Sequence, residues 1–191
     1  MNCNFSIAHY EECLQKIKHS ATKNLLIHDV DVWSDILNDF IDLEKKYNVD
    51  SIYFFRFHAL HYNLLSYNSI KIIKKITDIK NIDVGLHVEP FYLKDFNIML
   101  EQKNILEKIY GFPIRYYSVH EPTKFQVKTD LNDLHNVGIK KISFNSCEGK
   151  YISDSSSRWR EGCMCEHIGK KDLTILTHVQ WWYNEYSGET Y

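Results

Sequence analysis

The segment HDVD at positions 28–31 contains the residues whose types and spacing point most clearly to chemistry. It follows LLI at 25–27, a short apolar run that predicts a buried strand. A carboxylate is rarely buried without a partner, because removing its charge from water is costly. In an extended strand, Asp29 and Asp31 point to the same side. One of them could therefore bind a cation while the other, held nearby, takes a proton from water.

Other acids and imidazoles are expected at the same edge of a sheet. Three histidines directly follow short apolar segments that predict strands, namely His87, His120 and His178. Asp154 and Arg158 lie in the loop after another predicted strand. Carboxylate and imidazole together suit zinc or another first-row divalent ion, and one or two acids with two histidines leave coordination positions open for catalysis. The pattern therefore predicts a catalytic metal site.

Each of these residues also has an ordinary structural explanation. A histidine at a strand end is usually capped or solvated, and an aspartate after a strand is often a turn residue or a helix N-cap. An N-cap explains Asp31, which precedes a predicted helix, but it leaves Asp29 unexplained. The run RWR at 158–160 would fit a surface loop equally well. The joint occurrence of these groups at strand ends, rather than any single residue, favours a site.

The elements that must position these residues alternate along the chain. Apolar residues at helical spacing predict helices over 7–17, 33–47, 69–79, 95–110 and 130–137. Ser69 is expected as the N-cap of the third helix, and Gly111 and Gly138 as the C-terminal caps of the last two. Apolar and aromatic runs predict strands over 25–30, 51–57, 83–86, 115–119, 139–144 and 173–177. This alternation favours a parallel sheet, open or closed into a barrel, which binds ligands at the C-terminal ends of its strands.

Length and composition limit the class of protein. The 191 residues suffice for one domain, residues 1–191, and 44% apolar with 25% charged residues is typical of a globular chain. The net charge of −2 lacks the basic excess of a nucleic-acid-binding protein, so we expect no nucleic-acid partner. Because no apolar run reaches the length of a membrane span and the first residues lack a signal-peptide pattern, the sequence predicts a cytoplasmic protein. The oligomeric state is left open.

The remaining cysteines and histidines are interpreted as structural. Five cysteines are an odd number, which argues against a complete disulfide framework. The cysteines at 163 and 165 are too close together for the common CxxC zinc knuckle, so we interpret them as reduced thiols, one of which could lie near a site. We see no place at a strand end for His9, His19, His58, His61 and His135 and interpret them as structural.

An ordered set of segments, from about residue 24 to the end, resembles the polysaccharide deacetylase superfamily, also called carbohydrate esterase family four or the NodB-homology fold. More narrowly, it is similar to cytoplasmic HDVD-type members associated with surface-polysaccharide (lipopolysaccharide or capsule) biosynthesis. The segments are LIHDVD at 26–31, SIYFF at 51–55, VGLH at 84–87, YSVHEP at 117–122, SDSSSRWR at 153–160 and LTHVQWW at 176–182. The set is specific for the superfamily but not for a substrate.

The resemblance implies an α/β fold, a distorted, incomplete (β/α)7-type barrel with parallel strands in a single domain. It also implies one divalent metal ion, usually Zn²⁺. The matching positions make Asp29 the catalytic base and His178 the general acid, with Asp31 and His87 as metal ligands.

This chain departs from the family pattern at the second metal histidine. Many members carry it four residues after the first, where this chain has Phe91. We predict that His120 supplies the missing imidazole as the third metal ligand. The segment around His120 also replaces a family motif whose arginine steadies the base, and Arg56 or Arg158 is expected to take that role.

The implied reaction is removal of an N-acyl group, acetyl or formyl, from an amino sugar that is small or nucleotide-linked. Asp154 and Arg158 are expected to contact sugar hydroxyls or a phosphate. Trp159, Trp181 and Trp182 could stack on a pyranose face, although core packing explains these side chains equally well. Two other hypotheses stay open: a catalytically decayed carbohydrate-binding or assembly module of the same fold, and another metal-dependent hydrolase such as a cyclic amidase or phosphoesterase.

Overall fold

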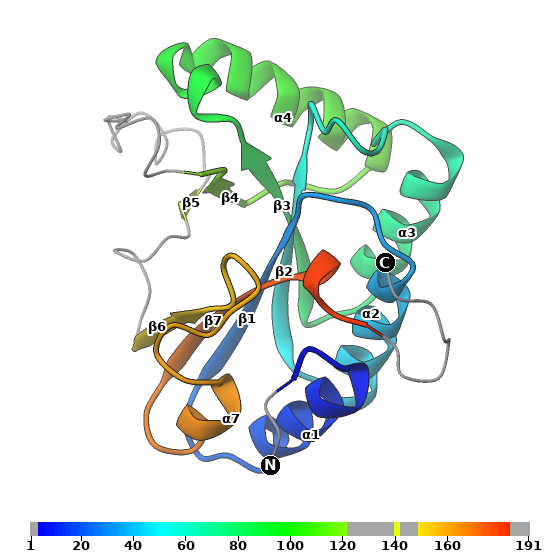
Figure 1. The fold of residues 1–191 in the computed structure, drawn as a ribbon. Helices are drawn as coiled ribbons and strands as arrows, with labels where there is room; N and C mark the ends of the chain where they lie inside the picture. Colours follow the sequence, from blue (N-terminus) through cyan, green and yellow to red (C-terminus); the bar gives the residue numbers. More distant parts are fainter. Residues whose placement is uncertain (1–3, 122–139, 142–148, 184–191) are drawn as a thin grey trace.

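A computed structural model describes residues 4–121, 140–141 and 149–183 of the chain. Within these ranges seven strands form one sheet in the order β5-β4-β3-β2-β1-β7-β6, and every neighbouring pair is parallel. The sheet curls into a half-barrel, and the longer helices pack along one side of it (Figure 1). The predicted α/β architecture, an incomplete barrel of parallel strands, is confirmed.

Strands and helices alternate along the chain, as the apolar periodicity predicts. The strands are β1 (Asn24–Val30), β2 (Asp50–Arg56), β3 (Ile82–Val88), β4 (Tyr116–Val119), β5 (Lys140–Lys141), β6 (Lys150–Ser153) and β7 (Leu173–His178). The helices are α1 (Ile7–Lys18), α2 (Ile36–Tyr47), α3 (Tyr67–Thr77), α4 (Phe96–Tyr110) and α7 (Met164–His167), with 3-10 turns η1 (Pro90–Lys94) and η2 (Val179–Trp181). In the described ranges, no helix combines the length and the apolar character that crossing a membrane requires.

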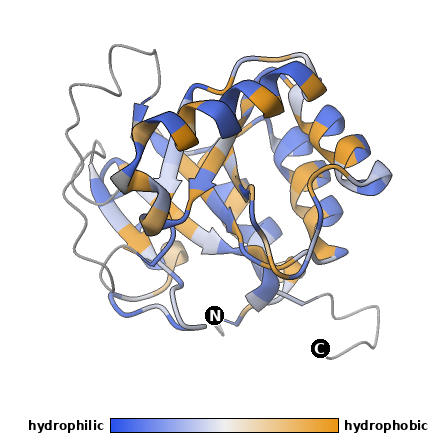
Figure 2. Cartoon of the chain, turned by 90° about the horizontal axis from the view of Figure 1, so that it is seen from above, coloured by the Kyte–Doolittle hydropathy of each residue, from blue (hydrophilic) through white to orange (hydrophobic). Residues whose placement is uncertain are grey.

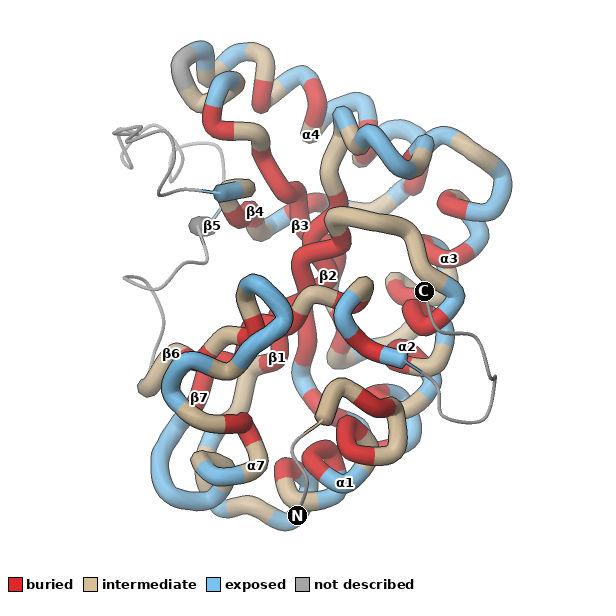
Figure 3. The backbone as a smooth tube through the Cα atoms, viewed as in Figure 1, coloured by how far each residue is buried: buried red, intermediate tan, exposed pale blue. Residues whose placement is uncertain are grey.

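The two faces of the sheet carry different side chains. The main hydrophobic core joins the helices to one face, and the central strands are almost entirely buried (Figure 3). The helices show apolar residues beside polar ones, as expected when only one side of each helix packs on the sheet (Figure 2). A smaller apolar cluster of Ile27, Ile52, Phe54 and Leu176 lies apart from the main core. Asp29 and Asp31 share the face of Ile27, because residues two apart in a strand point the same way.

The histidine of the HDVD segment belongs to the opposite, helix-covered face. His28 Nδ1 is 2.6 Å from Thr177 Oγ1, and His28 Nε2 is 2.8 Å from the buried Glu44 carboxylate. Hydroxyls of Tyr10, Ser51 and Tyr53 donate hydrogen bonds to the same carboxylate. Burial would raise the pKa of Glu44, but His28 and the hydroxyls of Ser51 and Tyr10 hold it below its ordinary value. This network ties α1 and α2 to the strands that position the aspartates.

Most predicted elements agree with the structure within a few residues, and two caps test the local predictions. Gly111 has a φ of 79° and its amide bonds the Glu107 carbonyl, which confirms it as the C-terminal cap of α4. The prediction of Ser69 as an N-cap is wrong, because Ser66 caps α3 and its hydroxyl accepts the Ser69 amide hydrogen. The short elements β6 and α7 were not predicted. The predicted helix over 130–137, Gly138 and most of the strand over 139–144 lie outside the described residues.

Candidate active site

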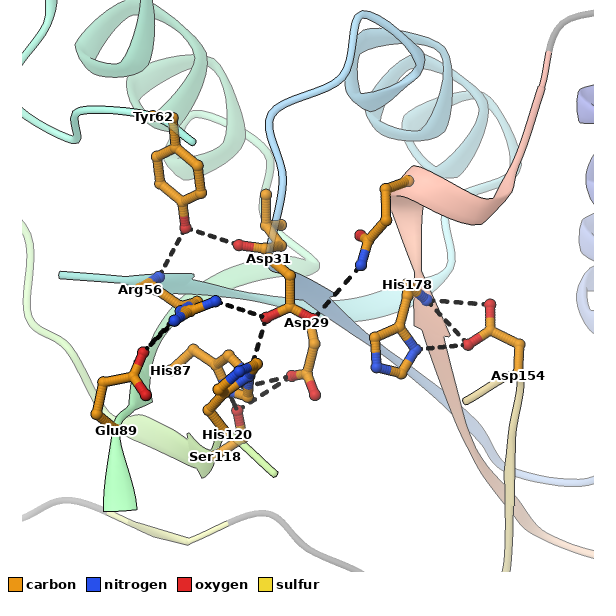
Figure 4. A network of polar contacts seen from close by, with 12 residues as sticks. Asp29, Asp31, Arg56, Tyr62, His87, Glu89, Ser118, His120, Asp154 and His178 are labelled. Atoms are coloured by element: carbon orange, nitrogen blue, oxygen red, sulfur yellow. Dashed lines mark hydrogen bonds and ion pairs between the residues drawn. The ribbon is translucent and has the colours of Figure 1, made fainter. Parts of the chain in front are cut away.

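Three of the predicted site residues meet at the C-terminal ends of β1, β3 and β4. Ligand atoms of Asp31, His87 and His120 all lie within 4.8 Å of one another (Figure 4). His120 Nδ1 is 3.1 Å from both Asp31 Oδ1 and His87 Nε2, and His87 Nε2 is 3.5 Å from Asp31 Oδ1. The His120 amide donates to the Val88 carbonyl at 2.9 Å, which extends the β3–β4 ladder by one residue and holds His120 beside His87.

This cluster fits a small divalent cation. Nitrogen and oxygen ligands about 2.0–2.1 Å from a tetrahedral zinc lie about 3.4 Å apart, and the three separations here are 3.1, 3.1 and 3.5 Å. Asp31 Oδ1 is buried and accepts no well-aligned hydrogen bond from any described residue. Burial alone would raise the pKa of Asp31, but the His120 and His87 imidazoles hold that pKa well below its ordinary range. An ionised oxygen thus faces two imidazole nitrogens, and three ligands leave positions for water and substrate.

Ser118 joins the cluster to Asp29 and determines how His87 is protonated. Its hydroxyl donates to Asp29 Oδ1 at 3.1 Å and lies 2.6 Å from His87 Nδ1. A hydroxyl has one hydrogen to donate, so Ser118 must accept its second hydrogen bond from the Nδ1–H of His87. The lone pair of His87 is then on Nε2, the atom that faces Asp31 and His120. Strand register places Ser118 directly opposite His87.

Replacing Ser118 by alanine is expected to weaken metal binding by about 10- to 100-fold, the usual effect of losing a hydrogen-bond partner of a ligating histidine. His87 would lose the acceptor that keeps its Nε2 unprotonated, while the backbone pairing of β3 and β4 remains. Competition with a chromophoric chelator measures the affinity. Thr77→Ala, which removes an exposed hydroxyl at the end of α3, is the matched control. Equal affinities of the two variants would contradict this role of Ser118.

Arg56 is the last residue of β2 and lies close to Asp31. Its guanidinium forms an ion pair with Glu89, and its Nη1 is 3.7 Å from Asp31 Oδ1. Tyr62 connects the same strand ends, since its hydroxyl accepts the Arg56 amide hydrogen and donates to the Val30 carbonyl. Of the two arginines considered for steadying the base, Arg56 thus contacts Asp31 rather than Asp29, and the side chain of Arg158 is exposed.

His178 ends β7 directly beside Asp29, its register partner on β1. Its Nδ1 lies 2.7 Å from Asp154 Oδ1, and its backbone amide donates to the same carboxylate at 3.0 Å. Burial would lower the pKa of His178, but Asp154, with smaller contributions from Asp29 and Asp31, raises it to about 9. His178 therefore carries a proton at neutral pH, as a general acid requires.

Asp154 was predicted to contact substrate, and the structure gives it other partners. The residue is completely buried, and besides His178 it accepts a hydrogen bond from the indole nitrogen of Trp182. Its carboxylate therefore has no access to a sugar hydroxyl. Sequence reasoning missed this because it did not recognise β6, the strand that ends directly before Asp154 and pairs with β7, which carries His178.

Of the three tryptophans considered for stacking on a sugar, two pack in the protein and one is exposed. Trp182 lies in the core against Phe5, and Trp159 stacks on the same Phe5 ring, so core packing accounts for both. Trp181 is 38% exposed, and its ring centroid is 6.5 Å from that of His178. Trp181 is thus the tryptophan placed to meet a ligand at this edge, and Arg158 lies exposed on the loop after Asp154.

Replacing Asp154 by asparagine is expected to lower the pKa of His178 from about 9 toward or below its ordinary value of 6.5. Because the folded state raises this pKa, protonated His178 adds to the free energy of unfolding; this contribution is complete below about pH 6.5 and is lost as the pH rises through 9. The variant should therefore lose stability most at neutral and acidic pH. The alkaline limb of the activity profile should move to lower pH. Histidine NMR titration measures the pKa, with Asp42→Asn on the surface as control. An unchanged His178 titration would contradict the assignment.

Comparison with known proteins supports the fold. A scan against protein-family models gave no match, and a search of curated proteins gave none. A CE4 family pseudoenzyme from Bacillus anthracis matches with a TM-score of 0.55 at 14% identity, over 84% of this chain and 56% of that chain. A mutant of it with restored enzymatic activity matches with a TM-score of 0.55 at 13% identity, over 85% of this chain and 58% of that one.

A chitin deacetylase from the fungal pathogen Colletotrichum lindemuthianum matches with a TM-score of 0.57 at 14% identity, over 84% of this chain and 75% of that chain. The present chain spans little more than half the length of the pseudoenzyme. At such low identity the likeness shows the fold, and the half-barrel described above is therefore the fold of CE4 family proteins.

Proposed function

We propose that this chain is a metal-dependent hydrolase that removes an N-acyl group from an amino sugar. The observation that carries the proposal is that three kinds of groups meet on one edge of the sheet: a metal-ligand set, a separate carboxylate and a protonated imidazole. The ligand set is Asp31, His87 and His120, the separate carboxylate is Asp29, and the imidazole is His178.

Each group has a distinct task in amide hydrolysis. A divalent cation, which we propose to be zinc, supplies Lewis-acid polarisation of the amide carbonyl and a water of lowered pKa. Asp29 is the general base that takes a proton from the attacking water, and Ser118 fixes its orientation through the hydrogen bond to Oδ1. His178 donates its proton to the departing amine nitrogen, which would otherwise leave poorly as an anion. Asp154 holds His178 protonated and correctly oriented.

The proposed substrate class comes from the fold neighbours and from the rim of the site. The chitin deacetylase among them acts, by its name, on an N-acetylated amino-sugar polymer. Trp181 offers an exposed aromatic face beside His178, which suits stacking on a pyranose ring. We therefore propose an N-acetyl or N-formyl sugar that stacks on Trp181 with its amide directed toward Asp29.

The test is a substrate screen on protein reconstituted with Zn²⁺, Co²⁺ or Mn²⁺. N-acetylglucosamine oligomers, nucleotide-linked N-acetyl and N-formyl sugars, a cyclic amide and a phosphate ester are compared, and release of acid and free amine is measured. Metal-dependent release from an N-acyl sugar supports the proposal. Turnover of only the cyclic amide or the phosphate ester, or no turnover with the metal bound, would overturn it.

A non-catalytic module of the same fold is the second candidate, and the Bacillus anthracis pseudoenzyme among the fold neighbours favours it. Such a module would bind an N-acyl sugar without releasing acid, and removing the ligand His87 would leave sugar binding unchanged. Calorimetric titration of His87→Ala and the unmodified chain with the same oligosaccharide separates the two candidates. We favour the enzyme because acid, base and ligand set are all present together.

A further inference from the structure

A second group of metal-ligating side chains lies outside the candidate active site, where α7 packs against α1 (Figure 1). Ligand atoms of His9, Cys163 and Cys165 all lie within 4.8 Å of one another. His9 Nε2 is 3.2 Å from Cys163 Sγ and 3.8 Å from Cys13 Sγ, and the Cys13 thiol also contacts that of Cys163. One imidazole nitrogen and two sulfurs therefore converge from two segments that are about 150 residues apart, and the Cys13 sulfur lies beside His9 and Cys163 but outside this mutually close group.

Local structure brings each of these groups to the same place. His9 and Cys13 are four residues apart in α1, so they lie on one face of that helix. Ser6 caps α1 and accepts the His9 amide hydrogen, which fixes the first turn. Gly162 has a φ of 89°, a left-handed conformation that suits glycine, and it turns the chain directly before Cys163. Cys163 then occupies the N-cap position of α7, and Cys165 follows within the helix.

The cluster is buried, yet it is polar and rich in sulfur. Cys13 is 0% exposed, Cys163 1% and His9 4%, while Cys165 is half-buried. In the described part of the chain these three cysteines are not joined in disulfide bonds. Buried thiols often act only as small apolar groups. Here, however, the Nε2 atom of His9 faces the thiols of Cys13 and Cys163. Apolar packing alone would not require an imidazole nitrogen at this position.

We propose that His9, Cys13, Cys163 and Cys165 form a structural zinc site that fastens α7 to α1. Three cysteines and one histidine are an established ligand set for closed, tetrahedral zinc. Sulfur about 2.3 Å and nitrogen about 2.0 Å from such a zinc lie about 3.5 Å apart, between the observed 3.2 and 3.8 Å. His9 Nδ1 faces the Glu12 carboxylate at 3.6 Å, the kind of partner that orients a zinc-ligating histidine.

The zinc would stabilise the whole segment between β6 and β7. That segment begins at Asp154, the partner of His178, and it includes Trp159, which stacks on Phe5 just before α1. A closed site differs from the candidate active site, where two imidazoles and one carboxylate leave positions open. The two sites therefore bind metal with different donor atoms, and this difference allows them to be measured separately.

The experiment loads the metal-free chain with Co²⁺, because thiolate ligands give cobalt a charge-transfer absorption that oxygen and nitrogen ligands do not. The unmodified chain should bind two cobalt ions and show the thiolate band. Cys163→Ser and Cys165→Ser should each lose the band and one ion, whereas His120→Ala should keep the band. His167→Ala, in the same helix α7 but outside the cluster, is the matched control and should keep both ions.

A second measurement does not depend on the folding of any variant. Alkylation of the zinc-loaded chain, followed by peptide mass mapping, should leave the half-buried Cys165 unmodified until a chelator removes the metal. The proposal is overturned if the unmodified chain shows no thiolate–cobalt band, or if the band persists in Cys163→Ser and Cys165→Ser. Neither result depends on hydrolase activity, so this site can be disproved while the proposed function stands, and the reverse also holds.

Discussion

Asparagine in place of Asp29 is expected to reduce kcat for an N-acyl sugar by about 100- to 10,000-fold, the range that a general base contributes. The amide oxygen of asparagine can still accept the Ser118 hydroxyl hydrogen, so the hydrogen bond that holds residue 29 is retained. The side chain cannot take a proton from water, however. Because Asp29 is not among the three clustered ligands, metal content should not change.

The measurement pairs steady-state kinetics with metal analysis of the same Asp29→Asn preparation. Asp83→Asn is the matched control, because Asp83 is a partly exposed carboxylate on the neighbouring part of the sheet, paired with Arg115. It should retain full kcat. An Asp29→Asn variant with unchanged kcat would show that another group activates the water, and one that loses its metal would show that Asp29 is a ligand rather than the base.

Much of this site could be predicted because the information lies in short stretches of sequence. Apolar runs identify the strands, and parallel strands bring the residues that follow them to one edge. Asp31, His87 and His120 each follow such a run, and the structure brings them together. The position of His120 beside His87 could be predicted for the same reason, and the structure places β4 next to β3 in the sheet.

The features that were missed depend on contacts between distant segments. Ser118 looks like any serine within a strand, and only the β3–β4 register reveals that it faces His87 and Asp29. Asp154 lies in the loop after β6, and only its contact with His178 on β7 reveals its role. Two of the residues clustered with His9, Cys163 and Cys165, are about 150 residues away in the chain, so no local spacing links them to it. Long-range packing therefore determines which polar side chains act together.

Alanine in place of His120 is expected to remove the metal from the candidate active site and with it the hydrolase activity. The loss of affinity should exceed the about 10- to 100-fold effect of an outer partner such as Ser118, since a ligand is lost directly. Asp31 and His87 alone would leave a two-ligand site. The fold should persist, because the His120 side chain is partly exposed and its strand contact is made through the backbone.

Metal analysis after dialysis, together with thermal unfolding, measures both parts of the His120→Ala prediction. His61→Ala, which removes an exposed imidazole, is the control and should retain metal and activity. Retention of both by His120→Ala would mean that the second imidazole comes from another residue. Retention of metal with loss of activity would assign His120 to substrate rather than to the ion. If the variant loses its metal but still binds the sugar, the sugar does not need the ion for binding. The rim near Trp181 would then be the sugar-binding surface.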